Sequence, residues 1–309
     1  MAPPLIAVVG PTAAGKSALA LRLAREHGGE IVSCDSLQVY RGLDIGSAKA
    51  TPEERASVPH HLIDVVEPDA VFSAADYARR AREAVAAIRA RGRLPIVAGG
   101  TGLYLRALLH GLFEGPSRDA ALRARLERMA ARFGDARLHR LLRRVDPRAA
   151  ERTHPNDRVR LVRALEVYAL TGRPISSQHG ESGPVLEGPQ LLLGLAPERG
   201  RLRKAVEERT RRMLERGLLE EVRGLLARFG EPPPRPLGAI GYRQAVAVLR
   251  GALAPDAAER LIVTETMRFA KRQMTWFRHQ AEGVRWFEDP EAAHDFAAGW
   301  LRAAEPSPA

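Results

Sequence analysis

The chain has 309 residues, of which 45% are hydrophobic and 28% charged, a composition typical of one or two globular domains. Its single cysteine, Cys34, excludes a disulfide framework within the chain and a zinc site built on cysteines. No apolar run approaches the roughly 20 residues that a membrane helix needs. The first apolar run is broken at Gly10, Pro11 and Lys16, so we expect no signal peptide, no membrane partner and a cytoplasmic protein.

The formal net charge of +11 favours polyanionic ligands such as nucleic acids. An arginine-rich composition throughout the genome would produce the same surplus, so charge alone leaves both explanations open. Lysine is rare in this chain, and its four positions are Lys16, Lys49, Lys204 and Lys271. A compact ammonium group suits a phosphate differently from a planar guanidinium, so each lysine is a candidate for a specific role.

The first third of the chain alternates apolar runs with helical patterns, which predicts a parallel α/β sheet. The predicted strands are 5–9, 30–33 and 94–98, and the predicted helices are 17–24 and 73–91. Ser73 and Asp76 have the spacing of a capping box at the start of the second helix.

The composition changes near residue 115, and residues 118–170 are rich in arginine, leucine and alanine with helical periodicity. A turn-rich stretch follows, and an apolar run at 190–195 predicts a return to the sheet. We therefore interpret residues 115–189 as an all-helical insertion into an α/β domain formed by residues 1–114 and 190–309. Beyond the insertion we expect helices within 198–229, 242–250 and 255–280, a strand at 284–287 and a disordered tail at 305–309.

The segment GPTAAGKS at 10–17 fits the pattern G-x-x-x-x-G-K-[ST] of a phosphate-binding P-loop. It follows a predicted strand and opens a predicted helix, the context that a P-loop requires. Inward-pointing backbone N–H groups and the helix N-terminus would favour an anion. Lys16 would reach the terminal phosphates and Ser17 would ligate Mg²⁺. The loop predicts a polyphosphate ligand without specifying which one.

Asp35 follows the predicted strand 30–33, and ligands of open α/β sheets bind beyond such carboxyl ends. It should therefore lie beside the P-loop, where it could act on Mg²⁺ indirectly, accept a substrate proton or merely cap a turn.

The strand 94–98 runs into Gly99-Gly-Thr-Gly102, where an ATP-hydrolysing P-loop protein would carry an acidic residue. This difference argues against an NTPase. The glycines indicate that chain or substrate approaches the backbone closely, or that the turn is tight.

Basic and apolar side chains occupy different faces of the predicted helix 255–280. The basic face carries Arg268, Lys271, Arg272, Thr275 and His279. The apolar face carries Met267, Ala270, Met274 and Phe277. The apolar face indicates core packing, and the basic face is either solvated or in contact with phosphates.

Taken together and in their order along the chain, the motifs of this sequence resemble those of the bacterial tRNA dimethylallyltransferases, also called tRNA isopentenyltransferases. The matches run nearly the whole chain, from GPTAAGKS at 10–17 through DSLQVYRGLDIGSAK at 35–49, PHHLIDVVEP at 59–68, FSAADY at 72–77, GGTGLYLRAL at 99–108, HPNDRVRLVRALEV at 154–167 and AIGYRQA at 239–245 to AKRQMTWFR at 270–278. A lone P-loop is common, whereas this combination is highly specific. Lys49 and Lys271 both fall inside these motifs.

The resemblance implies transfer of a dimethylallyl group from dimethylallyl diphosphate to the N6 amine of the adenine 3′ to the anticodon of a tRNA. Diphosphate is released, and Mg²⁺ is required. It also implies a P-loop kinase-like parallel sheet core with a helical insertion that embraces the anticodon stem-loop. A channel through the core would let the flipped adenine meet the donor. We expect a monomer.

The chemistry of this reaction and the resemblance together suggest the roles of the site residues. Lys16, Asp35 and Thr101 would be catalytic, with Asp35 as the general base for the amine proton. Residues expected to hold the donor diphosphate are Gly10, Pro11, Thr12, Ala13, Ala14, Gly15, Lys16, Ser17 and Arg209, with Ser17 also on the metal. Residues expected to contact tRNA are Asp35, Ser36, Leu37, Gln38, Thr101, Arg123, Arg160, Arg163, Lys271, Arg272, Gln273 and Arg278.

Two other classes of protein remain as alternatives. An ATP-dependent small-molecule phosphotransferase is what the P-loop alone would favour, but the strand end at 98–102 and the basic insertion argue against it. A non-catalytic RNA-binding protein would have no use for a complete P-loop.

Overall fold

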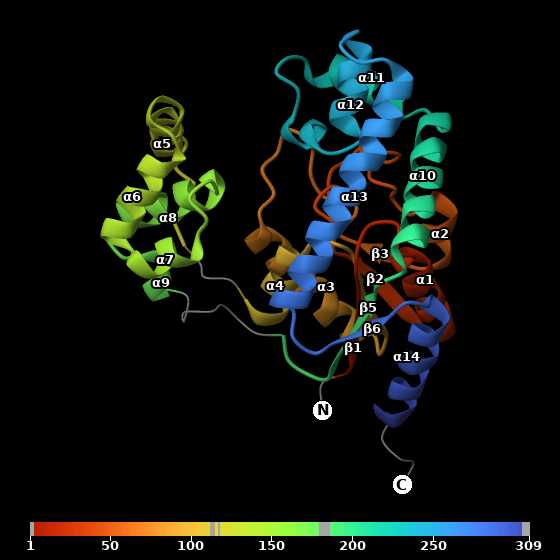
Figure 1. Cartoon of the computed structure of the whole chain (residues 1–309). Coiled ribbons are helices and arrows are strands. Elements are labelled where there is room, and N and C mark those ends of the chain that lie inside the picture. Colours follow the sequence, from red (N-terminus) through yellow and green to blue (C-terminus); the bar gives the residue numbers. More distant parts are fainter. Residues whose placement is uncertain (1–2, 112–114, 117, 179–185, 305–309) are drawn as a thin grey trace. The chain divides into compact units, whose positions relative to one another are not determined.

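The computed structural model describes residues 3–111, 115–116, 118–178 and 186–304 (Figure 1). The chain divides into two compact units. The core unit comprises residues 1–109 and 186–309, and the helical unit comprises residues 110–185. From the sequence we placed the corresponding boundaries at residues 115 and 189.

The core unit is built on a six-stranded sheet in the order β3-β2-β4-β1-β5-β6, and every strand pairing in it is parallel. Its strands are β1 Leu5–Val9, β2 Gly29–Ser33, β3 His60–His61, β4 Leu94–Ala98, β5 Gln190–Leu195 and β6 Val284–Phe287. The α/β fold class predicted from the sequence is confirmed. In a parallel sheet the carboxyl ends of neighbouring strands share one edge, so β1, β2 and β4 deliver their following loops to the same place.

Both faces of the sheet are covered, and the alternation of β1 shows how. Leu5, Ala7 and Val9 join a core with α3 (Ala74–Ala90) and α4 (Gly102–His110), whereas Ile6 and Val8 join a second core with α1 (Lys16–Glu26) and α14 (Pro290–Ala304). Side chains buried on both faces explain why the strands appear in the sequence as continuous apolar runs.

The helices of the core unit are α1 Lys16–Glu26, α2 Pro52–Ser57, α3 Ala74–Ala90, α4 Gly102–His110 (whose last residue falls in the helical unit), α10 Arg199–Glu215, α11 Leu218–Phe229, the 3₁₀ turn η1 Arg235–Gly238, α12 Tyr242–Leu249, α13 Pro255–Gln280 and α14 Pro290–Ala304. None of the helices in the described part of the chain is long and apolar enough to cross a membrane.

Short or weakly patterned elements account for the differences from the sequence predictions. The capping box at the start of α3 is confirmed, because Ser73 and Asp76 each bond the other's backbone N–H. By contrast, α2, α4, α14 and β3 were not predicted. β3 is a polar pair of residues that becomes a strand through its pairing with β2. The predicted tail at 305–309 lies outside the described residues.

A further apolar cluster lies between α11, α12 and the loop that follows β2. Leu43 of that loop is fully buried with Val222 of α11 and Tyr242 of α12. The ring of Tyr242 lies where a Cβ on Gly46 would stand, so the loop approaches the helix closely. This cluster fixes the loop that carries several of the predicted site residues.

The helical unit has an apolar core of its own. Its helices are α5 Ala120–Phe133, α6 Asp135–Val145, α7 Pro147–Arg152, α8 Arg158–Thr171 and α9 Ile175–Gln178. Leu138, Leu142 and Leu161 are fully buried in this core. Side chains of Asp119, Asp146 and Asp157 cap the first turns of α5, α7 and α8, as aspartate commonly does.

Candidate active site

The Gly10–Ser17 loop connects β1 directly to α1, which begins at Lys16. Gly10 has a φ of +136°, and a Cβ there would overlap the carbonyl of Leu195 on β5, so glycine is required at this position. The Lys16 Nζ folds back and donates to the Pro11 carbonyl at 2.6 Å. α1 begins at Lys16 without a side-chain cap, so the first N–H groups of the helix are available to an anion.

Lys16 and Arg209 of α10 place two positive charges at this loop. The pKa of Lys16 is lowered to about 8, first by burial and then by the charge of Arg209, against the opposing effect of the Asp35 carboxylate. Burial also lowers the pKa of Arg209. Burial destabilises the charged form of both groups, so an anion between them would be bound favourably.

The loop opens into a cleft of about 470 Å³ within the core unit. One wall is formed by residues 13–18 of the loop and α1, and another by Arg209 and Arg212 of α10 and by Arg216, which follows that helix. Ser33, Gln38 and residues 48–51 complete the lining. A volume of this size accommodates a small diphosphate ester.

Asp35 and Thr101 lie together at the ends of β2 and β4. The Asp35 Oδ1 accepts the backbone N–H of Leu37 at 2.8 Å, so the residue does cap a turn. Thr101 accepts the N–H of Ser36 through its hydroxyl at 3.0 Å and donates its own N–H to the Cys34 carbonyl at 3.1 Å. The charge of the Asp35 carboxylate raises the pKa of both Lys16 and Arg209. A carboxylate that can accept a proton therefore lies close to two cations that can bind phosphate.

The close approach predicted at Gly99, Gly100 and Gly102 is confirmed. A Cβ on Gly99 would overlap the backbone of Cys34. A Cβ on Gly100 would overlap the Gln273 side chain, and one on Gly102 would overlap the ring of Trp276. Other segments of the same chain therefore occupy the space next to these glycines.

Gln273 does not lie where we expected it, among the exposed residues of α13. Its residue surface is only 7% exposed. Its Oε1 accepts the N–H of Thr12 at 2.9 Å, and its Nε2 donates to the carbonyl of Gly100 at 2.9 Å. The amide is thus occupied inside the core unit, which corrects its assignment to the RNA surface.

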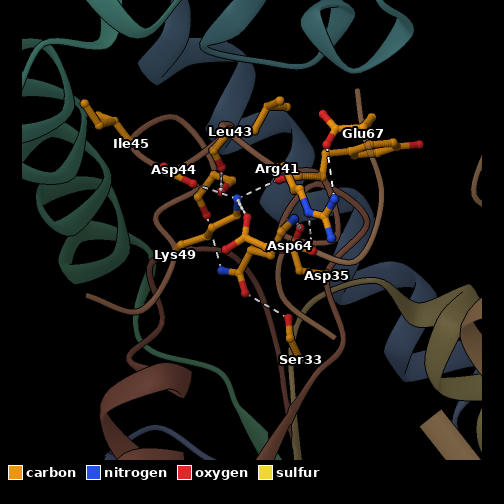
Figure 2. Close-up of polar contacts among 12 residues, drawn as sticks. Ser33, Asp35, Arg41, Leu43, Asp44, Ile45, Lys49, Asp64 and Glu67 are labelled. Carbon is orange, nitrogen blue, oxygen red and sulfur yellow. Dashed lines mark hydrogen bonds and ion pairs between the residues drawn. The ribbon is translucent and has the colours of Figure 1, made fainter. Parts of the chain in front are cut away.

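Lys49 fixes the loop that carries Asp35, Ser36, Leu37 and Gln38 (Figure 2). Its side chain is 2% exposed, and its Nζ bonds Asp44 Oδ1 at 2.7 Å, Asp64 Oδ1 at 2.6 Å and the Tyr40 carbonyl at 2.6 Å. This ammonium joins both ends of the 40–49 turn to Asp64.

Gln38 uses its amide within this loop. Its Oε1 accepts the Ser33 hydroxyl at 2.8 Å, and its Nε2 donates to the carbonyl of Ala48 at 3.2 Å. It lines the cleft from that position, whereas Ser36 is exposed and Leu37 is half-buried against the α11–α12 cluster.

Glu221 of α11 is a residue that the sequence did not reveal. Its carboxylate accepts the consecutive N–H groups of Asp44, Ile45 and Gly46 at 3.0, 2.7 and 3.2 Å, together with the Tyr242 hydroxyl at 2.8 Å. No motif marks it, because its partners are backbone groups far away in the sequence.

The outer face of α13 is basic, as predicted from its periodicity. Lys271, Arg272 and Arg278 are exposed, and the guanidinium of Arg272 lies 5.6 Å from the centre of the Phe269 ring. Ala270 and Phe277 are buried on the opposite side of the helix.

The three arginines of the helical unit that we expected to contact tRNA fall into two groups. Arg123 and Arg163 both bond the fully buried Glu166, at 2.8 and 2.9 Å. Burial alone would raise the pKa of Glu166, but these hydrogen bonds outweigh it and lower the pKa to about 2. Of the three, Arg160 is the most open to solvent, with a side chain 67% exposed beside Asp157 at 3.4 Å.

Comparison with known proteins decides the family. A family model described as IPP transferase matches residues 38–280. The chain belongs to the IPP transferase family.

Curated relatives of this IPP transferase family member cover nearly its whole length. The tRNA dimethylallyltransferase of Geobacter metallireducens is 52% identical over 288 residues, with 93% of each chain covered. The tRNA dimethylallyltransferase 2 of Geotalea uraniireducens is 50% identical over 291 residues, again with 93% of each chain covered.

Solved structures agree with this assignment. The tRNA isopentenylpyrophosphate transferase of Bacillus halodurans is 39% identical, with a TM-score of 0.69 and 97% of each chain covered. A eukaryotic dimethylallyltransferase solved while acting on tRNA is 25% identical, with a TM-score of 0.79 over 98% of this chain and 80% of that one.

The lowered pKa of Lys16 gives a pH dependence to anion binding. A bound diphosphate favours the ammonium, so affinity is full below the pKa of the free site, about 8, and falls as pH rises above it. For a simple diphosphate ester, whose own second pKa is about 6, we expect an approximately tenfold loss of affinity between about pH 7 and 9. Calorimetry at several pH values measures it.

Lys16→Arg is the matched variant, because a guanidinium keeps its charge over this range. Its affinity should change less than about twofold over the same interval. An equal loss in the variant and the wild type would place the titrating group elsewhere.

Lys49→Met should destabilise the core unit by about 2 kcal/mol, because it removes the cation that Asp44 and Asp64 share and leaves Asp64 with Arg55 alone. The partial exposure of the two carboxylates, 58% for Asp44 and 30% for Asp64, places the cost below that of breaking a fully buried pair. Urea unfolding measures it, with Lys204→Met as the control. Lys204 is exposed on α10 and should cost less than about 0.5 kcal/mol. Similar values for the two variants would contradict the bracing role of Lys49.

Proposed function

We propose that this chain transfers a dimethylallyl group from dimethylallyl diphosphate to the N6 amine of the adenine 3′ to the anticodon in tRNA, releasing diphosphate. The observation that carries the proposal is that Lys16 and Arg209, which line a cleft of about 470 Å³, lie close enough to Asp35 for its carboxylate to raise the pKa of both. The near-full-length relatives named tRNA dimethylallyltransferase support it.

The donor half of the reaction uses the cationic side of the cleft. The bond between the allylic carbon and its phosphate oxygen breaks, and both electrons leave with diphosphate. Lys16, Arg209 and the N-terminus of α1 stabilise the negative charge that develops on that group. Because both cations are poorly solvated before the anion binds, their interaction with the leaving group is strong.

The acceptor half uses the ends of β2 and β4. The adenine N6 forms a bond to the allylic carbon and must lose one proton, which the Asp35 carboxylate accepts. The hydrogen bond from Ser36 N–H to the Thr101 hydroxyl and that from Leu37 N–H to Asp35 hold the two side chains in a fixed relation. The adenine must leave the base stack of its loop to reach them.

The residues present also fit a Mg²⁺ ion that binds together with the diphosphate. Among the described residues there is no cluster of three or more His, Cys, Asp or Glu side chains that could form a cage for a metal. Mg²⁺ often takes few protein ligands and completes its shell with phosphate oxygens and water. Ser17, which lines the cleft, would hold it. When bound, the ion would offset the charge of the departing diphosphate.

For the tRNA, we propose that Lys271, Arg272 and Arg278 of α13 and Arg160 of α8 contact phosphates of the anticodon stem-loop. Their exposure supports this role, since phosphate contacts set the register of a nucleic acid. Arg123 and Arg163 contribute through the buried Glu166 that they hold. The protein would act as a monomer in the cytoplasm, where its tRNA substrates reside.

A phosphotransferase is the weaker proposal. The loop Gly10–Ser17 would suit ATP, but β4 ends at Ala98 and is followed by Gly99 and Gly100, without the acidic side chain that holds Mg²⁺ and water in such enzymes.

Unmodified tRNA, Mg²⁺ and dimethylallyl diphosphate test the function directly. After digestion to nucleosides, mass spectrometry should show N6-dimethylallyladenosine, and a tRNA with guanine at the target position should yield none. An unmodified tRNA combined with ATP turnover would contradict the proposal.

Asp35→Asn should lower kcat by about 10²–10⁴ with little change in tRNA affinity. Asparagine retains the side-chain oxygen that accepts the Leu37 N–H, so the turn persists, but it cannot take the N6 proton. Single-turnover rates and tRNA binding measure the two effects separately. Equal losses in both would make Asp35 a binding residue instead.

Arg272→Ala should weaken tRNA binding and reduce the slope of log affinity against log salt by about one unit, as expected for one lost phosphate contact. Arg302→Ala, an exposed arginine on α14, is the control and should leave both unchanged. If only the donor affinity responds to Arg272→Ala, α13 does not contact the RNA.

A further inference from the structure

The side-chain amide of Gln273 links two loops that come from different strands. Thr12 belongs to the loop after β1, which we propose to hold the donor diphosphate. Gly100 belongs to the turn after β4, which carries Thr101. Gln273 accepts from Thr12 N–H and donates to the Gly100 carbonyl, both at 2.9 Å, with 7% of its surface exposed.

The turn after β4 is shaped to receive this helix. The missing Cβ of Gly100 makes room for the Gln273 amide, and the missing Cβ of Gly102 makes room for the Trp276 ring. Gln273 and Trp276 are three residues apart, so one side of α13 contacts the turn at two points separated by about one helical turn. Such contacts fix both the position and the rotation of the turn relative to α13.

A primary amide satisfies both partners without depending on pH. The Thr12 N–H needs an acceptor and the Gly100 carbonyl needs a donor, and the amide supplies both from one buried side chain. A leucine of similar volume would leave both unpaired. A carboxylate would keep the bond to Thr12 but would oppose the Gly100 carbonyl with a second acceptor.

We propose that Gln273 is a positioning residue that holds the donor loop and the acceptor turn in register, so that the allylic carbon and the adenine N6 meet at bonding distance. This rests on the proposed function, because it concerns the geometry of that same transfer. Displacements of about 1 Å between reacting groups reduce rates by about 10². The cost of losing the amide therefore falls on the chemical step rather than on the affinity for either substrate.

Gln273→Leu should lower the single-turnover rate at saturating donor and tRNA by about 30-fold or more. The tRNA Kd should stay within about threefold, because the exposed Lys271 and Arg272 are untouched. Gly100→Ala should reproduce the loss with Gln273 intact, since the new Cβ would displace the amide.

Gln273→Glu adds a second measurement, the pH dependence of the rate, which general destabilisation would not change. A buried carboxyl group is protonated more easily than an exposed one, because burial raises its pKa. The protonated acid can accept from Thr12 N–H and donate to the Gly100 carbonyl, as the amide does. Its rate relative to the wild type should therefore be highest at low pH and should fall as pH rises through the raised pKa, whereas the loss in Gln273→Leu should be independent of pH.

Gln244→Leu is the matched control. Gln244 is a second buried glutamine of the core unit, 2% exposed, and its Oε1 accepts the N–H of Gly241 at the start of α12. It should lose stability but keep the single-turnover rate within about twofold.

The outcomes separate the two proposals. A wild-type protein that modifies no tRNA would contradict the proposed function. An active wild type whose rate survives Gln273→Leu, or an equal rate loss in Gln244→Leu, would overturn the role of Gln273. So would a Gln273→Leu defect confined to tRNA affinity.

Discussion

Two poorly solvated cations at the carboxyl edge of the sheet are the constraint on which the site depends. Lys16 comes from the loop after β1 and Arg209 from α10, and burial lowers the pKa of each. The Asp35 carboxylate opposes this lowering at both cations without cancelling it, so the site favours a further anion. The parallel order of β2, β4 and β1 places Asp35, which we propose as the proton acceptor, at the same edge of the sheet. The proposed binding of the leaving diphosphate and the proposed loss of the amine proton therefore occur at one edge of the sheet.

The surrounding structure keeps these loops in place by buried polar contacts. Lys49 and Glu221 hold opposite sides of the loop after β2, one through two carboxylates and a carbonyl and the other through three N–H groups. Gln273 joins the loops after β1 and β4. Each of these side chains forms hydrogen bonds with backbone groups of the loops, which holds the loops of the site in defined positions.

Much of this could be predicted from the sequence, for physical reasons. β1, β4, β5, β6 and α13 have the predicted bounds, because strong apolar runs or a proline mark their ends. Lys16 was predicted from the P-loop pattern and Asp35 from the rule that ligands bind beyond strand ends, whereas the roles of Thr101 and Arg209 came from family resemblance. Gln273 was misplaced, although its spacing from Ala270 and Phe277 puts it beside the buried face of α13. Glu221 gave no signal, since its partners are backbone groups.

The central claim is that the Gly10–Ser17 loop holds a leaving group rather than a group to be transferred. A donor labelled with ³H on the dimethylallyl carbon chain and ³²P on the terminal phosphate tests it directly. With unmodified tRNA, the account predicts that every ³H incorporated into tRNA is matched by one ³²P released as intact diphosphate, and that no ³²P joins the tRNA. Release of ³²P as single phosphate, its appearance on any acceptor, or diphosphate release without ³H on tRNA would contradict the account.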